Sequence, residues 1–94
     1  MQIEHEPDDR RFVARLEDGR ALLDYEILED GTWDLTRTYV PEKHRHRGIA
    51  TQLVLHVLER AAEGNREVVP SCPFVADVIR KNPEWGRFVR RGPS

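Results

Sequence analysis

Cysteine is almost absent from this 94-residue sequence, which has a single one, Cys72. One cysteine cannot form an intramolecular disulfide or supply a cysteine-based zinc site. The four histidines show no convincing metal-binding spacing either, so we expect no metal. Long apolar runs are also missing, since none approaches ~18 residues and no basic–apolar signal segment opens the chain. We therefore expect a soluble, cytoplasmic protein without a membrane partner.

The sequence also lacks a strong excess of charge of either sign. Its 15 basic and 17 acidic residues leave a formal net charge of −2. Nucleic-acid-binding proteins usually have a strong basic excess, so the composition argues against that class. The charges are unevenly spread, however, because residues 1–30 are rich in acids whereas 43–47 and 87–91 are basic. A local anion site is therefore compatible with the composition.

Alternation of apolar and polar residues predicts strands between residues 11 and 40. The pairs Asp18-Gly19 and Asp30-Gly31 are typical of hairpin turns and divide this stretch into three runs. Residues 11–40 are thus predicted to form a three-stranded antiparallel meander. The polar residues 1–10 are expected to form a loose lead-in to a single domain that spans residues 1–94.

After Gly48 the apolar residues recur with helical spacing. This pattern predicts a helix over residues 49–63, which the stop signal Gly64-Asn65 ends. A short strand follows at residues 67–69. A second helix is predicted to begin at Pro73, because proline has no donor to lose in the first helical position. Cys72 is then the N-cap of that helix, whose apolar stripe is predicted to consist of Phe74, Val75, Val78 and Ile79.

The third strand, the helix 49–63 and the strand 67–69 form one strand–helix–strand unit. Its two strands are predicted to run parallel, which makes the sheet mixed and the fold class α+β. In such units ligands lie outside the carboxyl ends of the strands. The segments at those ends, 41–48 and 70–73, contain the glycine loop and the only cysteine. We therefore predict the functional site there.

The segment 43–50, Lys-His-Arg-His-Arg-Gly-Ile-Ala, places basic residues at the start of the predicted helix. A helix N-terminus carries roughly half a positive charge, so cations are mildly unfavourable there. The arrangement makes sense if an anion binds to the free backbone N–H groups and the flanking arginines. Gly48 would let the backbone approach that anion closely, and Ala50 would leave the first turn uncrowded. A solvated basic loop with a permissive glycine explains the same pattern.

The pattern Arg45-x-x-Gly48-x-Ala50 resembles the pyrophosphate-binding signature R/Q-x-x-G-x-G/A of the GNAT acetyltransferase superfamily. More narrowly, the chain resembles a small GNAT-like family with little beyond the common core. The resemblance runs from about Phe12 to Trp85 and includes, in order, Trp33-Asp34-Leu35, Thr38, Val40-Pro41, Arg47-Gly48-Ile49-Ala50, Cys72 and Asn82-Pro83. Arg37 stands where the family commonly has histidine, so a catalytic or acceptor-orienting role of that histidine is not carried over.

The resemblance implies a GNAT-like fold, with the meander followed by the strand–helix–strand unit and a C-terminal helix. It implies an acetyl-CoA-dependent N-acetyltransferase that moves an acetyl group to an unidentified amine, on a small molecule or a protein. The pantetheine arm would pair with the strand end, and the pyrophosphate would lie on the amides that follow it. The coenzyme-binding residues it implies are Tyr39, Val40, Arg45, His46, Arg47, Gly48, Ile49, Ala50 and Thr51.

Cys72 is the candidate catalytic residue. A thiol at a helix N-terminus feels the helix dipole, which favours the thiolate and suits a nucleophile. A lone cysteine is more often a small buried hydrophobe. The resemblance favours a role in the site, because it directs the thioester toward the end of the fourth strand. Covalent acetylation and direct transfer within a ternary complex both stay open, and no carboxylate base is identified.

Two further functions fit parts of the sequence. A non-catalytic module that binds CoA or another phosphate ligand is one, because the chain lacks the N-terminal helices that usually shape a GNAT acceptor pocket. A nucleic-acid binder that uses residues 43–47 and 87–91 is the other. The near-neutral net charge counts against it, so no nucleic-acid partner is expected. The sequence does not predict the oligomeric state.

Overall fold

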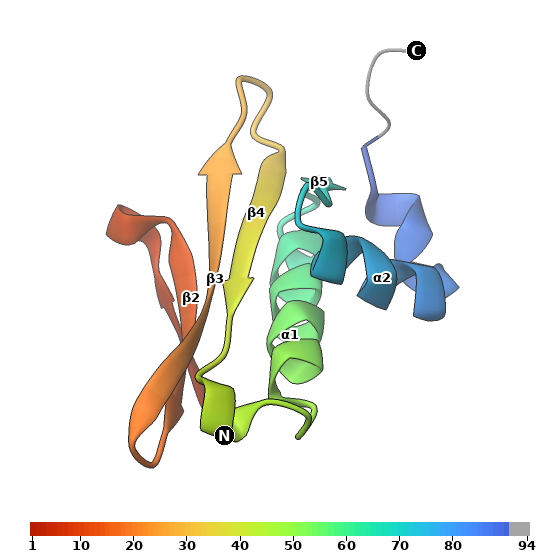
Figure 1. Ribbon diagram of the computed structural model, residues 1–94. Helices are drawn as coiled ribbons and strands as arrows, with labels where there is room; N and C mark the ends of the chain where they lie inside the picture. The colour runs from red at the N-terminus through yellow and green to blue at the C-terminus, as the bar shows by residue number, and fades with distance from the viewer. Residues whose placement is uncertain (91–94) are drawn as a thin grey trace.

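The computed structural model of the protein describes residues 1–90 and has the predicted α+β architecture with a mixed sheet (Figure 1). The strands lie in sequence order across the sheet: β1 (Gln2–Glu6), β2 (Arg11–Leu16), β3 (Gly19–Ile27), β4 (Trp33–Tyr39) and β5 (Val68–Val69). The helices are α1 (Ile49–Glu63) and α2 (Pro73–Lys81), with the 3-10 turns η1 (Pro7–Asp9), η2 (Glu42–His44) and η3 (Pro83–Phe88). Arg91, part of the second basic segment, lies outside the described residues.

Strand β1 replaces the loose lead-in that was predicted for residues 1–10, so that prediction is wrong. It pairs antiparallel with β2, which places Ile3 opposite Ala14 and His5 opposite Phe12. The imidazole of His5 stacks on the Phe12 ring with centroids 4.1 Å apart, and its Nε2 lies 2.6 Å from the Tyr25 hydroxyl. A histidine counts as polar in a hydropathy pattern, yet here its flat ring packs as an apolar group would.

The antiparallel meander of β2, β3 and β4 is confirmed, with one local difference at its first turn. Leu16 pairs with Gly19, so the two turn residues are Glu17 and Asp18. Later in the meander the register between β3 and β4 shifts, because Asp24 and Tyr25 face Arg37 and Leu35 and leave Thr36 without a partner. An extra residue of this kind bends its strand and increases the local twist.

The parallel unit is confirmed but short. Strand β5 pairs with β4 only at Trp33–Val68 and Asp34–Val69. One more contact follows, in which the Cys72 backbone N–H donates to the Leu35 carbonyl over 2.9 Å. Beyond that point β4 continues without a partner among residues 1–90 on this side, since its bulge and Pro70 turn the two chains apart. The edge of β4 from Thr36 onward therefore faces an opening.

Helix α1 packs along the sheet, and α2 packs against α1 and β4 (Figure 1). Both helices have the predicted starts, with Gly48 and Cys72 as N-caps. The buried side of α1 consists of Leu53, Val54, Val57, Leu58 and Ala61. Each large aliphatic side chain so buried contributes roughly 1.5–3 kcal/mol relative to exposure. None of the described helices has the length and hydropathy required to cross a bilayer.

Candidate functional site

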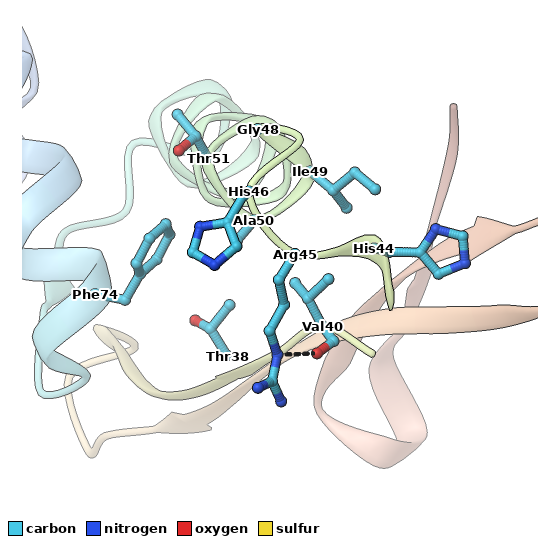
Figure 2. A pocket seen from close by; sticks show the side chains of 10 residues that line it. All are labelled: Thr38, Val40, His44, Arg45, His46, Gly48, Ile49, Ala50, Thr51 and Phe74. Carbon is cyan, nitrogen blue, oxygen red and sulfur yellow. Dashed lines mark hydrogen bonds between the residues drawn. The ribbon is translucent and has the colours of Figure 1, made fainter. Parts of the chain in front are cut away.

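A cavity of about 420 Å³ lies at the opening between β4 and α2, beside the first turn of α1 (Figure 2). Three segments form its walls: the end of β4, the loop that follows it into α1, and, from farther along the chain, the start of α2. Its lining residues are Thr38, Val40, His44, Arg45, His46, Gly48, Ile49, Ala50, Thr51 and Phe74. The cavity is therefore where the sequence analysis placed the site, at the carboxyl ends of the parallel strands.

The loop that enters α1 has an unusual backbone. His46 and Gly48 both adopt left-handed conformations, with φ of 67° and 77°. A Cβ at position 48 would meet no atom within 4 Å, so the backbone conformation and not crowding favours glycine here. No side chain caps α1, and no acid lies in its first turn. The N–H groups of this turn are thus without a side-chain acceptor and can bind an anion.

Two cations of the loop, Arg45 and Arg47, are not neutralised by acids in residues 1–90, whereas Lys43 pairs with Asp18. Arg45 donates from Nε to the Val40 carbonyl over 2.9 Å (Figure 2). Arg47 is exposed. Neither arginine pairs with a carboxylate of the described chain, whereas the arginines of β2 pair with acids of the neighbouring strands. The positive end of α1 and two guanidinium groups therefore share one uncompensated region, which suits a pyrophosphate.

Most of the predicted coenzyme-binding residues meet at this cavity. Val40, Arg45, His46, Gly48, Ile49, Ala50 and Thr51 all line it. The side chains of Tyr39 and Arg47 do not. Because side chains alternate along a strand, Thr38 and Val40 face the cavity and Tyr39 faces the opposite side, where it is 40% exposed. There the guanidinium carbon of Arg37 lies 6.0 Å from the centre of the Tyr39 ring.

Cys72 does not line the cavity itself but lies behind Thr38, which does. Its side chain is buried, and its sulfur lies 3.6 Å from the hydroxyl of Thr38, which lines the cavity. Burial raises the pKa of the Cys72 thiol, but the backbone amides of Val75 and Phe74 and the Thr38 hydroxyl lower it by more. The net pKa is below the usual value. The sulfur makes no capping hydrogen bond, so the amides act on it as nearby dipoles.

Three lining residues, Thr38, His44 and Phe74, are not among the predicted site residues. Phe74 was assigned to the apolar stripe of the second helix, but it is 38% exposed, and Figure 2 shows its ring on the wall across from Arg45. The prediction for Phe74 is therefore wrong. The side-chain alternation that ends at Val40 would have indicated Thr38. No sequence signal indicated that Phe74 lines the cavity, because the tertiary structure decides which segment lies beside the first turn of α2.

Within residues 1–90, no group of three or more histidine, cysteine, aspartate and glutamate side chains is placed to hold a metal ion. The residues of the described cavity can bind an anion, and the hydroxyl of Thr38 lies beside the Cys72 thiol.

Known proteins are similar to this chain in sequence over most of its length. The family model of the GCN5-related N-acetyl-transferases matches residues 11–88, from β2 to η3. The chain is 33% identical over 85 residues to Protein NATD1 of Gallus gallus, with 88% of this chain and 77% of that protein covered. It is 32% identical over 85 residues to Protein NATD1 of Homo sapiens, with 88% and 75% covered. The chain belongs to the GCN5-related N-acetyltransferase family.

Proposed function

We propose that the protein transfers an acetyl group from acetyl-CoA to a primary amine, with the coenzyme bound in the cavity between β4 and α2. The observation that carries this proposal is the uncapped N-terminus of α1, which lies beside Arg45 and Arg47 at one end of a cavity that extends to Thr38. The pyrophosphate would accept hydrogen bonds from the amides of the first turn, and the two guanidinium groups would offset its charge.

The unpaired edge of β4 supports a place for the pantetheine arm. Beyond Leu35 this edge has no neighbouring strand in the described part of the chain, and its backbone groups can bind the amides of the arm as an added strand would. The Val40 carbonyl, which accepts from Arg45, marks the end of this edge nearest the phosphate loop. An arm that runs from Val40 toward Thr38 would bring the thioester close to Cys72.

In direct transfer, the lone pair of the unprotonated amine attacks the thioester carbonyl carbon. The tetrahedral intermediate then collapses with cleavage of the C–S bond, so that CoA leaves as its thiolate and the new amide loses the amine proton to water. In the covalent route, the Cys72 thiolate attacks first and CoA thiolate leaves. The unprotonated amine then attacks the carbonyl carbon of the acetyl-cysteine, the C–S bond breaks to release the Cys72 thiolate, and the new amide loses the amine proton to water. The exposed fraction of Cys72, 7%, favours the direct route, because an attacking sulfur must reach the carbonyl carbon.

A binding module without catalysis is the second candidate function. Between β1 and β2 the described chain has only the 3-10 turn η1, so no helix there shapes a pocket for the acceptor. An enzyme needs a positioned acceptor, and this feature is therefore the specific observation in favour of the alternative.

One experiment separates the two functions. Calorimetry with acetyl-CoA would measure binding, and release of free CoA thiol would be followed over a panel of amines that includes lysine peptides, polyamines and amino sugars. We expect binding and amine-dependent thiol release. Binding with thiol release no faster than in buffer, for every amine, would leave only the binding module. Absence of binding by the folded protein would overturn both candidates.

A further inference from the structure

The turn between β2 and β3 reaches across to the loop that enters the proposed coenzyme site. The Asp18 carboxylate accepts a hydrogen bond from His44 Nε2 over 2.6 Å and pairs through its other oxygen with the Lys43 ammonium. The next residue, Gly19, which begins β3, lies against Pro41, since a Cβ built on Gly19 would be 3.6 Å from the proline ring. The β2–β3 hairpin thus contacts the loop at three positions.

These contacts differ from the other hydrogen bonds of the loop. The backbone bonds from His44 to Pro41 and from Arg45 to Glu42 are local, as is the bond from the Arg45 side chain to Val40. The bond from His44 to Asp18 spans 26 positions of sequence. The His44 side chain is only 12% exposed and turns away from the other lining side chains (Figure 2). His44 therefore connects the cavity wall to the neighbouring hairpin.

The charge of Asp18 is unexpected this close to an anion site. Its hydrogen bonds to Lys43 and His44 lower the pKa of the carboxyl to about 2, so it is ionised at neutral pH. By charge alone, an ionised carboxylate beside the pyrophosphate would weaken coenzyme binding. A mechanical role accounts for its place, because fixing the loop before the ligand arrives reduces the entropy lost on binding.

We propose that Asp18 is a positioning residue for the coenzyme site: through His44 and Lys43 it holds the loop 41–48 against the β2–β3 turn, and so keeps the amides at the start of α1 in the geometry that binds pyrophosphate. This inference rests on the proposed function. Asp18 contacts the loop but does not line the cavity. The inference thus gives a positioning role to an acidic residue that lies among basic ones.

The variants Asp18→Ala, Asp18→Asn and Glu17→Gln test it, with acetyl-CoA affinity measured by calorimetry. Glu17→Gln removes the same charge from the same turn without a contact to the loop, so it serves as the matched control. We expect Asp18→Ala to raise Kd about three- to fivefold, as for loss of an exposed ion pair. Asp18→Asn keeps one acceptor and should fall between wild type and alanine. Glu17→Gln should bind as wild type or slightly more tightly.

The sign of the change separates the mechanical role from simple electrostatics. If the charge of Asp18 acted only through its field, Asp18→Ala would bind acetyl-CoA as tightly as Glu17→Gln or more tightly, and that result would overturn the proposal. A loosened loop also has a signature without any ligand. Amide hydrogen exchange of residues 44–48 should be faster in Asp18→Ala than in wild type, with the protection of buried residues of α1 unchanged.

The exchange measurement keeps this proposal distinct from the proposed function. If wild type fails to bind acetyl-CoA, the proposed function is wrong, while exchange in the loop still reports whether Asp18 holds it. If exchange in the loop is the same in Asp18→Ala and wild type, Asp18 does not hold the loop. If exchange is faster but Kd is unchanged, the contact exists without a role in coenzyme binding, and the inference is likewise refuted.

Discussion

The hydroxyl of Thr38 lies 3.6 Å from the sulfur of Cys72 and joins the cavity wall on β4 to the N-cap of α2. This contact bridges the opening at the point where the two parallel chains have separated. It gives a buried thiol a polar neighbour that faces the cavity, and it lowers the pKa of Cys72 together with the nearby amides. Thr38 thus lies between Cys72 and the part of the cavity proposed to hold the thioester.

The first prediction separates covalent from direct transfer. If transfer is direct, Cys72→Ala should lower kcat by about tenfold, or about 1.4 kcal/mol of transition-state free energy, and leave turnover measurable. Intact-protein mass spectrometry of wild type after brief exposure to acetyl-CoA should show no acetyl-enzyme that forms as fast as turnover. Thr38→Val is the matched variant, because it keeps the shape and removes the hydroxyl. Abolished turnover in Cys72→Ala, with a rapidly formed adduct in wild type, would establish the covalent route instead.

The second prediction concerns the phosphate loop. Gly48→Glu should weaken acetyl-CoA binding by at least about tenfold, because it adds negative charge where two phosphates approach. The matched control is Gly31→Glu, since Gly31 also has a positive φ, 88°, and also has no atom within 4 Å of a built Cβ. Both variants should lose about 1–2 kcal/mol of stability from the left-handed backbone. Equal coenzyme affinity in the two folded variants would place the pyrophosphate elsewhere.

The third prediction concerns salt. Coenzyme affinity should fall as ionic strength rises from 0.05 to 0.5 M, because the Debye length shrinks from about 14 to about 4 Å. The fall should be partial, since backbone hydrogen bonds and contacts with the pantetheine arm are less screened. Arg47→Gln should reduce the salt dependence. Arg10→Gln should not, because Arg10 pairs with Glu26 and lies at the opposite end of β2 from the turn that contacts the loop. The same salt dependence in both variants would argue against Arg47 as a phosphate contact.

The fourth prediction concerns stability and pH. Burial lowers the pKa of His5 below its usual 6.5, and the positive charges of Arg60 and Arg66 and the neighbouring His56 lower it further. The unfolded chain therefore binds this proton at a higher pH than the folded chain does. The contribution of His5 to the free energy of unfolding should be fully present above about pH 6.5 and should be lost as pH drops through the lower pKa of the folded state.

His5→Phe tests this prediction, because phenylalanine retains the stack on Phe12 but cannot take up the proton. The thermal midpoint of wild type should drop between pH 7 and pH 5, and the drop should be smaller in His5→Phe. His46→Gln serves as the control, since His46 lies on the exposed loop, and its profile should follow wild type. If the thermal midpoint of His5→Phe dropped between pH 7 and pH 5 as much as that of wild type, the acid sensitivity would arise from another group.

Local patterns predicted most of the fold. The spacing of apolar residues located α1 within its observed bounds, Ile49–Glu63, and proline chemistry located the start of α2. The loop from Arg45 to Ala50 was found by its charges, its glycine and its family signature. These features are recognisable because each depends on residues within a few positions of one another. Strand β1 was missed for the same reason, since the residues that bury its His5 lie on β2 and β3.

The composition of the site beyond this loop was decided by the tertiary structure. Thr38 faces the cavity only because the bulge at Thr36 resets the register of β4, and Phe74 lines it only because β4 and β5 separate. The contact between Asp18 and His44 joins positions 26 residues apart. Sequence by itself determined which segments are strand, helix and anion-binding loop, because backbone preference and helix-end chemistry are local. Which side chains meet at the cavity depends on strand register and splay, which only the packed sheet fixes.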